Sequence, residues 1–276
     1  MSQKESLTAS LRPIKKMKFL TALATEQGVS HKSTDTPCQD SVLVKKEDDY
    51  LFLGLADGAG SAKHSDIGSS RILKFLSVHM RIAFDYYKNE EDSNEDLLKA
   101  IHMALDNSAN YHKVKIEDLS STLLFIAIQN DDYIVTHIGD GVIGTLDKDD
   151  ELSVFSEPEN GEFANQTYFI TSNDSNRVRI YRGDISDFNG LVLMSDGVED
   201  SLYEYKTRTL ASITRTMIKW LDTGSEEEIS SALKDNLKRV FSKKSQDDLS
   251  IAILRIHKDD IEFLEEKKEK ENHENN

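Results

Sequence analysis

Short runs of apolar residues recur along the chain and are separated by polar turns. Such runs, bounded by Gly, Pro, Asn or Asp, are typical of β-strands. Tyr50–Ala56 (YLFLGLA) is almost continuously apolar, which is typical of a strand buried on both faces. Thr122–Ile128 and Tyr133–Ile138 flank a short polar turn and predict a hairpin. The other predicted strands are Phe19–Thr25, Ser41–Lys46, Val142–Leu146, Leu152–Phe155, Gln166–Thr171, Val178–Tyr181, Leu191–Ser195 and Leu249–Ile256.

Four segments repeat apolar residues every three or four positions, the period of an α-helix that buries one face. We expect Leu76 and Ile82 on the buried stripe of the first helix, and Val240 on that of the last. Ser225 with Glu228 three residues later is the pattern of a capping box. The predicted helices are Asp66–Tyr87, Asn94–His112, Thr207–Leu221 and Glu226–Phe241.

The order of these elements is strands, two helices, strands, two helices and a final strand, which predicts an α+β fold built in layers. A chain of 276 residues is long enough for one sizeable core, and residues 19–256 are predicted to form a single domain. Residues 1–18 are predicted to be a flexible arm and 28–40 a loop. Residues 257–276 are charged and poor in apolar residues, so we expect a disordered tail.

Charge and cysteine content narrow the classes of partner. Asp and Glu number 50 against 34 Lys and Arg, which gives a net charge of −16. An acidic surface repels a phosphate backbone, so we expect no nucleic-acid partner. The single cysteine, Cys38, cannot form an internal disulfide, and no apolar run of about 18 residues predicts a membrane span. We therefore expect a cytoplasmic protein without a membrane partner.

Three predicted strands end in the same dipeptide, at Asp57-Gly58, Asp140-Gly141 and Asp196-Gly197. A carboxylate at the end of a strand lies at the rim of its sheet, and the glycine lets the chain turn sharply or approach a ligand. Asp-Gly is also the commonest hairpin turn, so one pair alone predicts only a turn. Three pairs, each after a strongly apolar strand, indicate more than turns.

Two further strands begin rather than end with aspartate. Asp40 precedes the second strand, and Asp247 with Asp248 precedes the last. Because neighbouring antiparallel strands alternate in direction, the ends of some share a rim with the starts of others. We therefore expect at least five carboxylates to gather at one rim.

Carboxylates that lie close together repel one another and raise each other's pKa, so a cluster of this size requires cations. Oxygen ligands with open positions suit Mg²⁺ or Mn²⁺. Two such ions, about 3.5–4 Å apart, can activate a water and clamp a phosphoryl group. The residues themselves thus point to hydrolysis of a phosphate ester.

The order of motifs resembles the type 2C, or PPM, protein phosphatases along about Phe19 to Ile256. The motifs are QD, LADGAG, SSTLL, GDG, LMSDGVED and QDDLSIAIL. The early motifs GVSH, PCQD and DGAGSA are similar to those of a bacterial branch of that family. The resemblance implies a four-layer α-β-β-α sandwich with two antiparallel sheets and a helix pair outside each.

The resemblance also implies a site with two metal ions, Mn²⁺ or Mg²⁺. Asp57 would bridge both ions, and the Gly58 carbonyl would bind one of them. Asp196 and Asp247 would bind on one side of the bridge. Asp40 would also help to bind the metal, partly through a water molecule. Asp140 matches the aspartate associated with a third ion that is bound more weakly, and Thr122 matches a framework threonine.

Three positions depart from the family pattern. Gln39 replaces a common Glu, Asp35 stands where many relatives carry a phosphate-gripping Arg, and Ala59 replaces a His that is a proposed general acid. His31 and His64 lie nearby and are our candidate catalytic residues, because a histidine can shuttle protons near neutral pH.

The resulting hypothesis is a metal-dependent protein phosphatase that hydrolyses phosphoserine and phosphothreonine by attack of an activated water. We expect a phosphorylated protein as substrate, a Ser/Thr kinase as functional counterpart, and a monomer. A pseudophosphatase that binds a phosphoprotein or another partner without turnover is the alternative that the three departures favour. A two-metal nuclease or phosphodiesterase is disfavoured by the negative charge.

Overall fold

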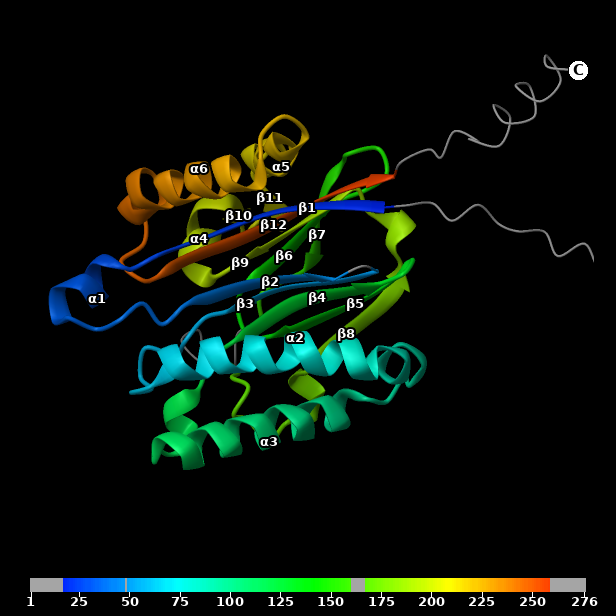
Figure 1. Cartoon of the computed structure of the whole chain (residues 1–276). Coiled ribbons are helices and arrows are strands. Elements are labelled where there is room, and N and C mark those ends of the chain that lie inside the picture. The colour runs from blue at the N-terminus through cyan, green and yellow to red at the C-terminus, as the bar shows by residue number, and fades with distance from the viewer. Residues whose placement is uncertain (1–16, 48, 160–166, 259–276) are drawn as a thin grey trace, which may run out of the picture.

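A computed structural model describes residues 17–47, 49–159 and 167–258. Two five-stranded antiparallel sheets lie face to face between helices (Figure 1). The first sheet has the order β1 (Met17–Glu26), β12 (Leu249–Lys258), β9 (Gly190–Met194), β6 (Val142–Leu146) and β7 (Leu152–Ser156). The second has the order β2 (Ser41–Glu47), β3 (Tyr50–Ala56), β4 (Leu123–Gln129), β5 (Asp132–Ile138) and β8 (Arg179–Asp184).

Helices cover the outer face of each sheet (Figure 1). Two long helices, α2 (Ser65–Asn89) and α3 (Asn94–His112), lie on the second sheet. On the first sheet lie α5 (Ile213–Lys219) and α6 (Glu226–Arg239). The predicted four-layer sandwich with a helix pair outside each sheet is confirmed.

Short elements complete the described part of the chain. They are α1 (Val29–Thr34), α4 (Asp196–Leu202), the small hairpin of β10 (Tyr203–Glu204) and β11 (Thr209–Leu210), and the 3₁₀ turns η1 (Ile116–Leu119), η2 (Ser175–Arg177), η3 (Ile185–Asp187), η4 (Trp220–Asp222) and η5 (Phe241–Lys243).

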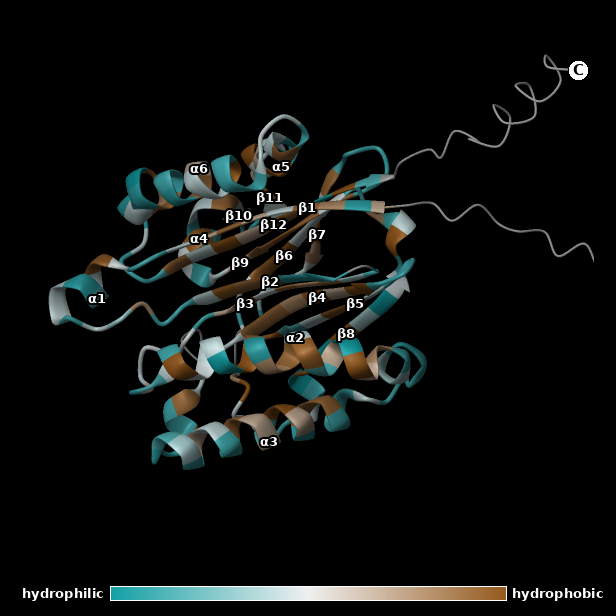
Figure 2. Ribbon diagram, viewed as in Figure 1, coloured by the Kyte–Doolittle hydropathy of each residue, from teal (hydrophilic) through white to brown (hydrophobic). Residues whose placement is uncertain are grey.

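Burial on both faces explains the continuous apolar runs of the central strands. Along β3, Leu51, Leu53 and Leu55 point into the core between the two sheets. The alternate residues Tyr50 and Phe52 point the other way and pack beneath α2 and α3. Figure 2 shows the central strands in brown, the colour of hydrophobic residues, within the layers. Each sheet is therefore sealed from water on one side by the other sheet and on the other by helices.

The hydrophobic stripes of the helices follow the prediction with two exceptions. Ile82 is 80% exposed because it lies two residues, or half a turn, from the buried Met80 of α2. Val240 is 51% exposed because α6 ends at Arg239 and Val240 is already its C-cap. Both placements on the buried stripe were wrong.

Several predicted boundaries were also wrong. The expected loop over 28–40 contains the six-residue helix α1, and α4 was not predicted. The helix expected over Thr207–Leu221 begins only at Ile213, because Thr209 and Leu210 pair with Tyr203 and Glu204. Gln166 lies outside the described residues, and 167–171 form no strand there.

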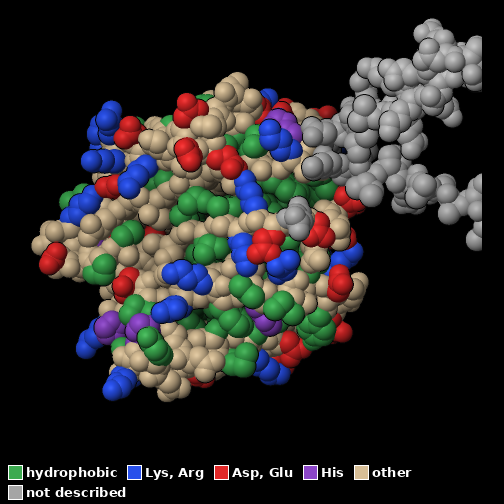
Figure 3. All heavy atoms as spheres, viewed as in Figure 1, with side chains coloured by type: hydrophobic (Ala, Val, Ile, Leu, Met, Phe, Trp, Pro, Cys, Tyr) green, Lys and Arg blue, Asp and Glu red, His purple; other side chains and the backbone are tan. Residues whose placement is uncertain are grey.

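The ends of the fold extend slightly beyond the range 19–256. The first strand begins at Met17 and pairs along its length with β12, which reaches Lys258. The predicted arm and tail otherwise lie outside the described residues. Within the described ranges, no helix is both long and apolar enough to span a bilayer. On the face drawn in Figure 3, side chains of both charges are interspersed.

Candidate metal centre and active site

The strand register explains how aspartates far apart in sequence meet at one rim. In the second sheet Ser41 pairs with Ala56, so Asp40 and Asp57 are the next residues beyond that pair. In the first sheet Met194 pairs with both Ile251 and Val142. The end of β9 therefore lies beside the starts of β12 and β6, and brings Asp196, Asp247 and Asp140 to the same rim.

Asp40 lies at the buried side of this rim. Only 6% of the residue is exposed, and both carboxylate oxygens are buried without a hydrogen-bond partner among the described residues. Burial, together with the charges of Asp248 and Asp196, raises the pKa of Asp40 to about 8. A buried carboxylate with two free oxygens is unstable in its charged form unless a cation neutralises it.

Asp57 and Asp196 lie next to Asp40 and to each other. Burial, followed by the charges of Asp40 and Asp196, holds the pKa of Asp57 well above its usual range. The pKa of Asp196 rises to about 6, mainly through burial and then through the charge of Asp140. One oxygen of Asp196 is buried without a partner in the described part of the chain. The three carboxylates thus share negative charge that the described part of the chain leaves uncompensated.

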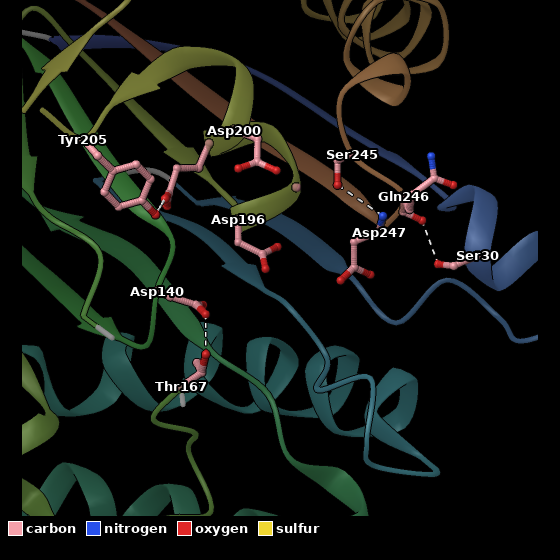
Figure 4. A pocket seen from close by; sticks show the side chains of 11 residues that line it. Ser30, Asp140, Thr167, Asp196, Asp200, Tyr205, Ser245, Gln246 and Asp247 are labelled. Carbon is pink, nitrogen blue, oxygen red and sulfur yellow. Dashed lines mark hydrogen bonds between the residues drawn. The ribbon is translucent and has the colours of Figure 1, made fainter. Parts of the chain in front are cut away.

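A pocket of about 510 Å³ opens onto this rim, and Figure 4 shows its labelled side chains. Asp196 and Asp247 line it from the first sheet, and Asp140 lines it from the turn between β5 and β6. The other lining residues are Ser30, Thr167, Gly197, Glu199, Asp200, Tyr205, Ser245 and Gln246. Among the described residues that line it, none is Lys, Arg or His.

Asp140 is oriented by a residue that sequence reasoning missed. The Thr167 hydroxyl donates a hydrogen bond to one Asp140 carboxylate oxygen (Figure 4). Burial nevertheless raises the pKa of Asp140. The carboxylate is therefore held toward the pocket but remains short of compensating positive charge.

Two adjacent aspartates, Asp247 and Asp248, have different roles. Asp247 lines the pocket, whereas Asp248 is only 2% exposed and does not. Asp248 accepts hydrogen bonds from the backbone N–H groups of Gly28, at 2.6 Å, and Gln39, at 2.5 Å. These bonds tie both ends of the segment that contains α1 to the start of β12, so Asp248 supports the site without facing it.

Gly28 and Gly58 occupy positions where the backbone has no room for a side chain. A Cβ on Gly28 would lie 2.4 Å from the carbonyl carbon of Asp247. A Cβ on Gly58 would lie 2.7 Å from the carbonyl oxygen of Gln39. Gly58 also bridges to Ser121, beside the predicted framework residue Thr122. The Thr122 hydroxyl accepts from the Asp57 N–H at 3.1 Å, which places the first Asp-Gly pair against β4.

The candidate histidines do not line the pocket. Nδ1 of His31 lies 3.0 Å from an Asp248 carboxylate oxygen. Ser30, its neighbour in α1, does line the pocket. His64 precedes α2 and its backbone N–H donates to the Asp118 carbonyl. The structure thus places the His31 ring next to a residue that lines the pocket and within ion-pair distance of a carboxylate, without the geometry of a hydrogen bond.

The three departures from the family pattern also do not line the pocket. Gln39 is buried, and its side-chain amide donates to the Ala62 carbonyl at 3.3 Å. Asp35 is exposed at the end of α1, where its backbone is left-handed with φ 56°. Ala59 is 5% exposed and has no polar group.

The acidic groups fit divalent cations by chemistry, although their side chains do not converge on one point. No three His, Cys, Asp or Glu side chains within the described ranges surround a single point closely enough to bind one ion. Asp40 and Asp196 nevertheless have oxygens without a partner and raised pKa values, so a bound cation would stabilise both carboxylates in their charged form. Oxygen donors of this kind suit Mg²⁺ or Mn²⁺.

Among the pocket residues that sequence reasoning missed, three come from α4 and the turn after it. Glu199 and Asp200 follow Asp196 by three and four positions, the spacing that brings side chains to one face of a helix. A prediction of α4 would have revealed both. Tyr205 lies beyond the helix in the β10–β11 turn, and no local pattern indicates that it reaches the pocket.

Comparison with known proteins agrees with this architecture. Residues 27–238 match the family described as Protein phosphatase 2C. The chain is 28% identical over 171 residues to serine/threonine-protein phosphatase 3 of Escherichia coli (strain K12). That match covers 58% of this chain and 65% of the relative, so it spans just under two thirds of that protein.

Solved structures of low sequence identity share the fold. A bacterial serine phosphatase superposes with a TM-score of 0.60 at 15% identity, covering 90% of this chain and all of that one. The catalytic domain of the serine threonine protein phosphatase PstP, in complex with two manganese ions, superposes with a TM-score of 0.59 at 17% identity, covering 87% of this chain and 99% of that one. Serine/threonine phosphatase Stp1 from Staphylococcus aureus superposes with a TM-score of 0.57 at 14% identity, covering 92% of this chain and 100% of that one.

A β-sandwich whose rim gathers aspartates from both sheets agrees with the family that the motifs predicted. The family match extends over most of the sandwich, from the end of β1 to α6. The chain belongs to the protein phosphatase 2C family.

Proposed function

We propose that this protein is a metal-dependent phosphatase that hydrolyses phosphoserine and phosphothreonine in proteins. The observation that carries the proposal is the rim itself. Burial and neighbouring carboxylates raise the pKa values of Asp40, Asp57 and Asp196. Three of their oxygens have no partner among the described residues. Such a group beside an open pocket favours cations and, through them, a phosphate group.

The carboxylates would hold two ions, Mn²⁺ or Mg²⁺. Asp57, the Gly58 carbonyl, Asp196, Asp247 and Asp40 are the proposed ligands. Asp140, oriented by Thr167, is proposed for a third and weaker ion. When bound, such ions lower the pKa of a water and neutralise charge on the phosphoryl group.

The protein's own side chains position the substrate and transfer a proton. The pocket of about 510 Å³ is open enough to admit a phosphorylated side chain. In the reaction, a water oxygen bonds to phosphorus, the bond from phosphorus to the serine or threonine oxygen breaks, and that oxygen takes up a proton. His31, whose ring lies beside Asp248, is our first candidate for this proton and His64 the second, because a histidine can transfer protons near neutral pH.

One assay tests the proposal directly. Purified protein is incubated with p-nitrophenyl phosphate and with a phosphoserine peptide, with Mn²⁺ and after exhaustive chelation by EDTA. We expect turnover with Mn²⁺ and its loss in EDTA. Mn²⁺ should also raise the melting temperature, because a ligand that binds only the folded state stabilises it. Unchanged turnover in the metal-free protein would contradict the proposal.

A pseudophosphatase remains the second candidate, because Gln39, Asp35 and Ala59 replace residues that many relatives use. Gln39 is neutral and bonded to Ala62, so it offers the rim no additional charge. This candidate predicts that Mn²⁺ raises the melting temperature while no phosphate ester is hydrolysed with any divalent metal. The melting and turnover assays together separate the two functions.

The partner of the enzyme is proposed to be a phosphorylated protein, with a Ser/Thr kinase supplying the phosphate. We also propose a monomer in the cytoplasm, without a nucleic-acid or membrane partner. Sedimentation of the metal-loaded protein tests the oligomeric state, and a dimer at micromolar concentration would contradict it.

A further inference from the structure

The turn that carries Asp140 is held from two sides. The carbonyl of Gly139, the residue before it, accepts a hydrogen bond from the Glu159 N–H at 3.0 Å and another from the Arg179 guanidinium at 3.4 Å. The Asp140 carboxylate accepts from the Thr167 hydroxyl (Figure 4). The backbone before Asp140 and its side chain are therefore both tied to residues outside the turn between β5 and β6.

The Glu159 carboxylate joins two arginines beside this turn. Arg177 donates a hydrogen bond to its Oε1 at 2.7 Å, and Nε of Arg179 forms an ion pair with its Oε2 at 3.6 Å. Arg179 also donates to the Glu157 carbonyl at 2.7 Å. The three charged side chains are only partly exposed, so salt screens these pairs less than it screens surface pairs. The Arg179 guanidinium thus connects residues 157–159 with the backbone before Asp140.

A cation–π contact links the two sides of the turn. The guanidinium carbon of Arg177 lies 4.1 Å from the centroid of the Tyr168 ring. Tyr168 directly follows Thr167, whose hydroxyl holds the Asp140 carboxylate. The contacts therefore close on themselves and form what we term the Asp140 support network, which consists of Gly139, Asp140, Thr167, Tyr168, Arg177, Glu159 and Arg179.

This network fixes a direction without neutralising the carboxylate that it holds. Glu159, Arg177 and Arg179 are paired with one another, whereas burial still raises the pKa of Asp140. A carboxylate that is already oriented loses less conformational freedom when it binds an ion, so its affinity is higher. The arrangement suits a ligand that must be held ready for a weakly bound cation.

We propose that Arg179 and Glu159 are positioning residues that hold the Asp140 carboxylate in place for the weakly bound third ion. The inference rests on the proposed phosphatase function, because that proposal gives Asp140 this ion. Neither residue is a proposed metal ligand, and neither lines the pocket. Their loss should therefore weaken the third ion and leave the two tightly bound ions nearly unchanged.

The experiment is equilibrium dialysis of the full-length, metal-stripped protein against graded concentrations of Mn²⁺, which counts tight and weak ions. We expect Arg179→Met to raise the Kd of the weak ion about tenfold or more, and Glu159→Gln about threefold or more. Arg179→Lys should lie between wild type and Arg179→Met, because lysine keeps the charge but lacks the fork that reaches two carbonyls. The Kd of the tight ions should change less than about twofold.

Turnover of p-nitrophenyl phosphate provides a second measurement. At low Mn²⁺ the variants should have a reduced kcat that recovers as Mn²⁺ is added, while KM for the ester stays within about twofold of wild type. The matched controls are Arg215→Met and Glu151→Gln, which remove an exposed ion pair of 2.6 Å at the other end of β6. Both controls should keep the wild-type affinity for the weak ion.

A merely structural role gives a different result. Arg179→Met and Glu159→Gln would then lower the melting temperature but keep the Kd of the weak ion within about twofold of wild type, which would overturn the inference. A wild type that binds two ions and no third would also overturn it. Glu159→Gln decides the question if Arg179→Met does not fold. Failure of the proposed function is seen separately, as a wild type that binds Mn²⁺ without hydrolysing p-nitrophenyl phosphate, or that binds none.

Discussion

At the scale of single residues, the rim concentrates negative charge that no cation among the described residues compensates. Asp40 and Asp196 have raised pKa values, caused first by burial and then by neighbouring carboxylates. Their sequence positions, one before a strand and one after another, could be predicted from the Asp-Gly and Gln-Asp motifs. The supporting role of Asp248 could not, because only the folded chain places Gly28 and Gln39 beside it.

The first prediction concerns Asp57→Asn and Asp196→Asn. Each should lower kcat by about 100-fold or more, because the loss of a ligand charge weakens metal binding. The metal-free variants should be at least as stable as the wild type, since the change removes repulsion between carboxylates. Circular dichroism and melting check the fold, and p-nitrophenyl phosphate checks turnover. Asp106→Asn, at an exposed position of α3, is the control. Wild-type rates in both variants would refute the assignment of the site.

His31 is tested separately, because its neighbour Asp248 gives it two possible functions. If His31 contacts the phosphate or transfers a proton, His31→Ala should lower kcat/KM about tenfold or more, which corresponds to about 1.4 kcal/mol. If it only stabilises Asp248, kcat/KM stays within about twofold of wild type while the melting temperature falls. His64→Ala, measured in parallel, shows whether the second candidate histidine has either effect.

At the scale of elements, the length and burial of a segment decide how well its sequence predicts it. The strands β3 and β6 were predicted with their observed ends, because each is buried along its whole length. The helix α1 has six residues and none is buried, so it has no hydrophobic stripe to reveal it. In α4 a buried Glu and Gly take the place of apolar residues, which hid both the helix and its contribution to the pocket.

The cap of α6 provides a prediction at this scale. Ser225 and Glu228 exchange the hydrogen bonds of a capping box, as their spacing indicated. Ser225→Ala should lower the free energy of unfolding by about 1 kcal/mol, because it leaves an N–H at the start of the helix without its acceptor. Urea denaturation measures the change. Ser231→Ala, on the exposed side of the same helix, should cause no loss. An equal loss in both variants would show that the cap has no special effect.

At the scale of the whole molecule, charges also organise the part of the first sheet away from the rim. Arg255 of β12 is 8% exposed and pairs with Asp150, in the β6–β7 turn, at 2.6 Å. It also pairs with Asp222 of η4 at 2.7 Å, and Lys219 of α5 reaches Asp150 at 2.9 Å. These contacts join β12, a turn and the helical layer. Unlike the rim, each carboxylate here has a cation, so this cluster stabilises the fold and offers no ligand site.

The pH dependence of Asp150→Asn separates this stabilising cluster from the rim. The hydrogen bond from Arg255 lowers the pKa of Asp150 below its usual range. Asp150 therefore binds fewer protons in the folded than in the unfolded chain. Its stabilising contribution is present above the unfolded pKa of about 3.9 and is lost as the pH falls below it. Asparagine tolerates the left-handed backbone of this residue, φ 61°, so the substitution changes mainly the charge.

We expect Asp150→Asn to lower the free energy of unfolding by about 1–3 kcal/mol at pH 7, because it leaves the partly buried Arg255 with one anion fewer. The deficit should shrink steadily below about pH 4 as Asp150 of the unfolded wild type becomes protonated. Urea denaturation of both proteins between pH 3 and 7 measures it. Asp235→Asn, an exposed charge of α6, is the control and should change stability little at any pH. A deficit that stays constant over the whole range would mean that the introduced amide destabilises the turn itself and that the charge of Asp150 is not what joins β12 to the helical layer.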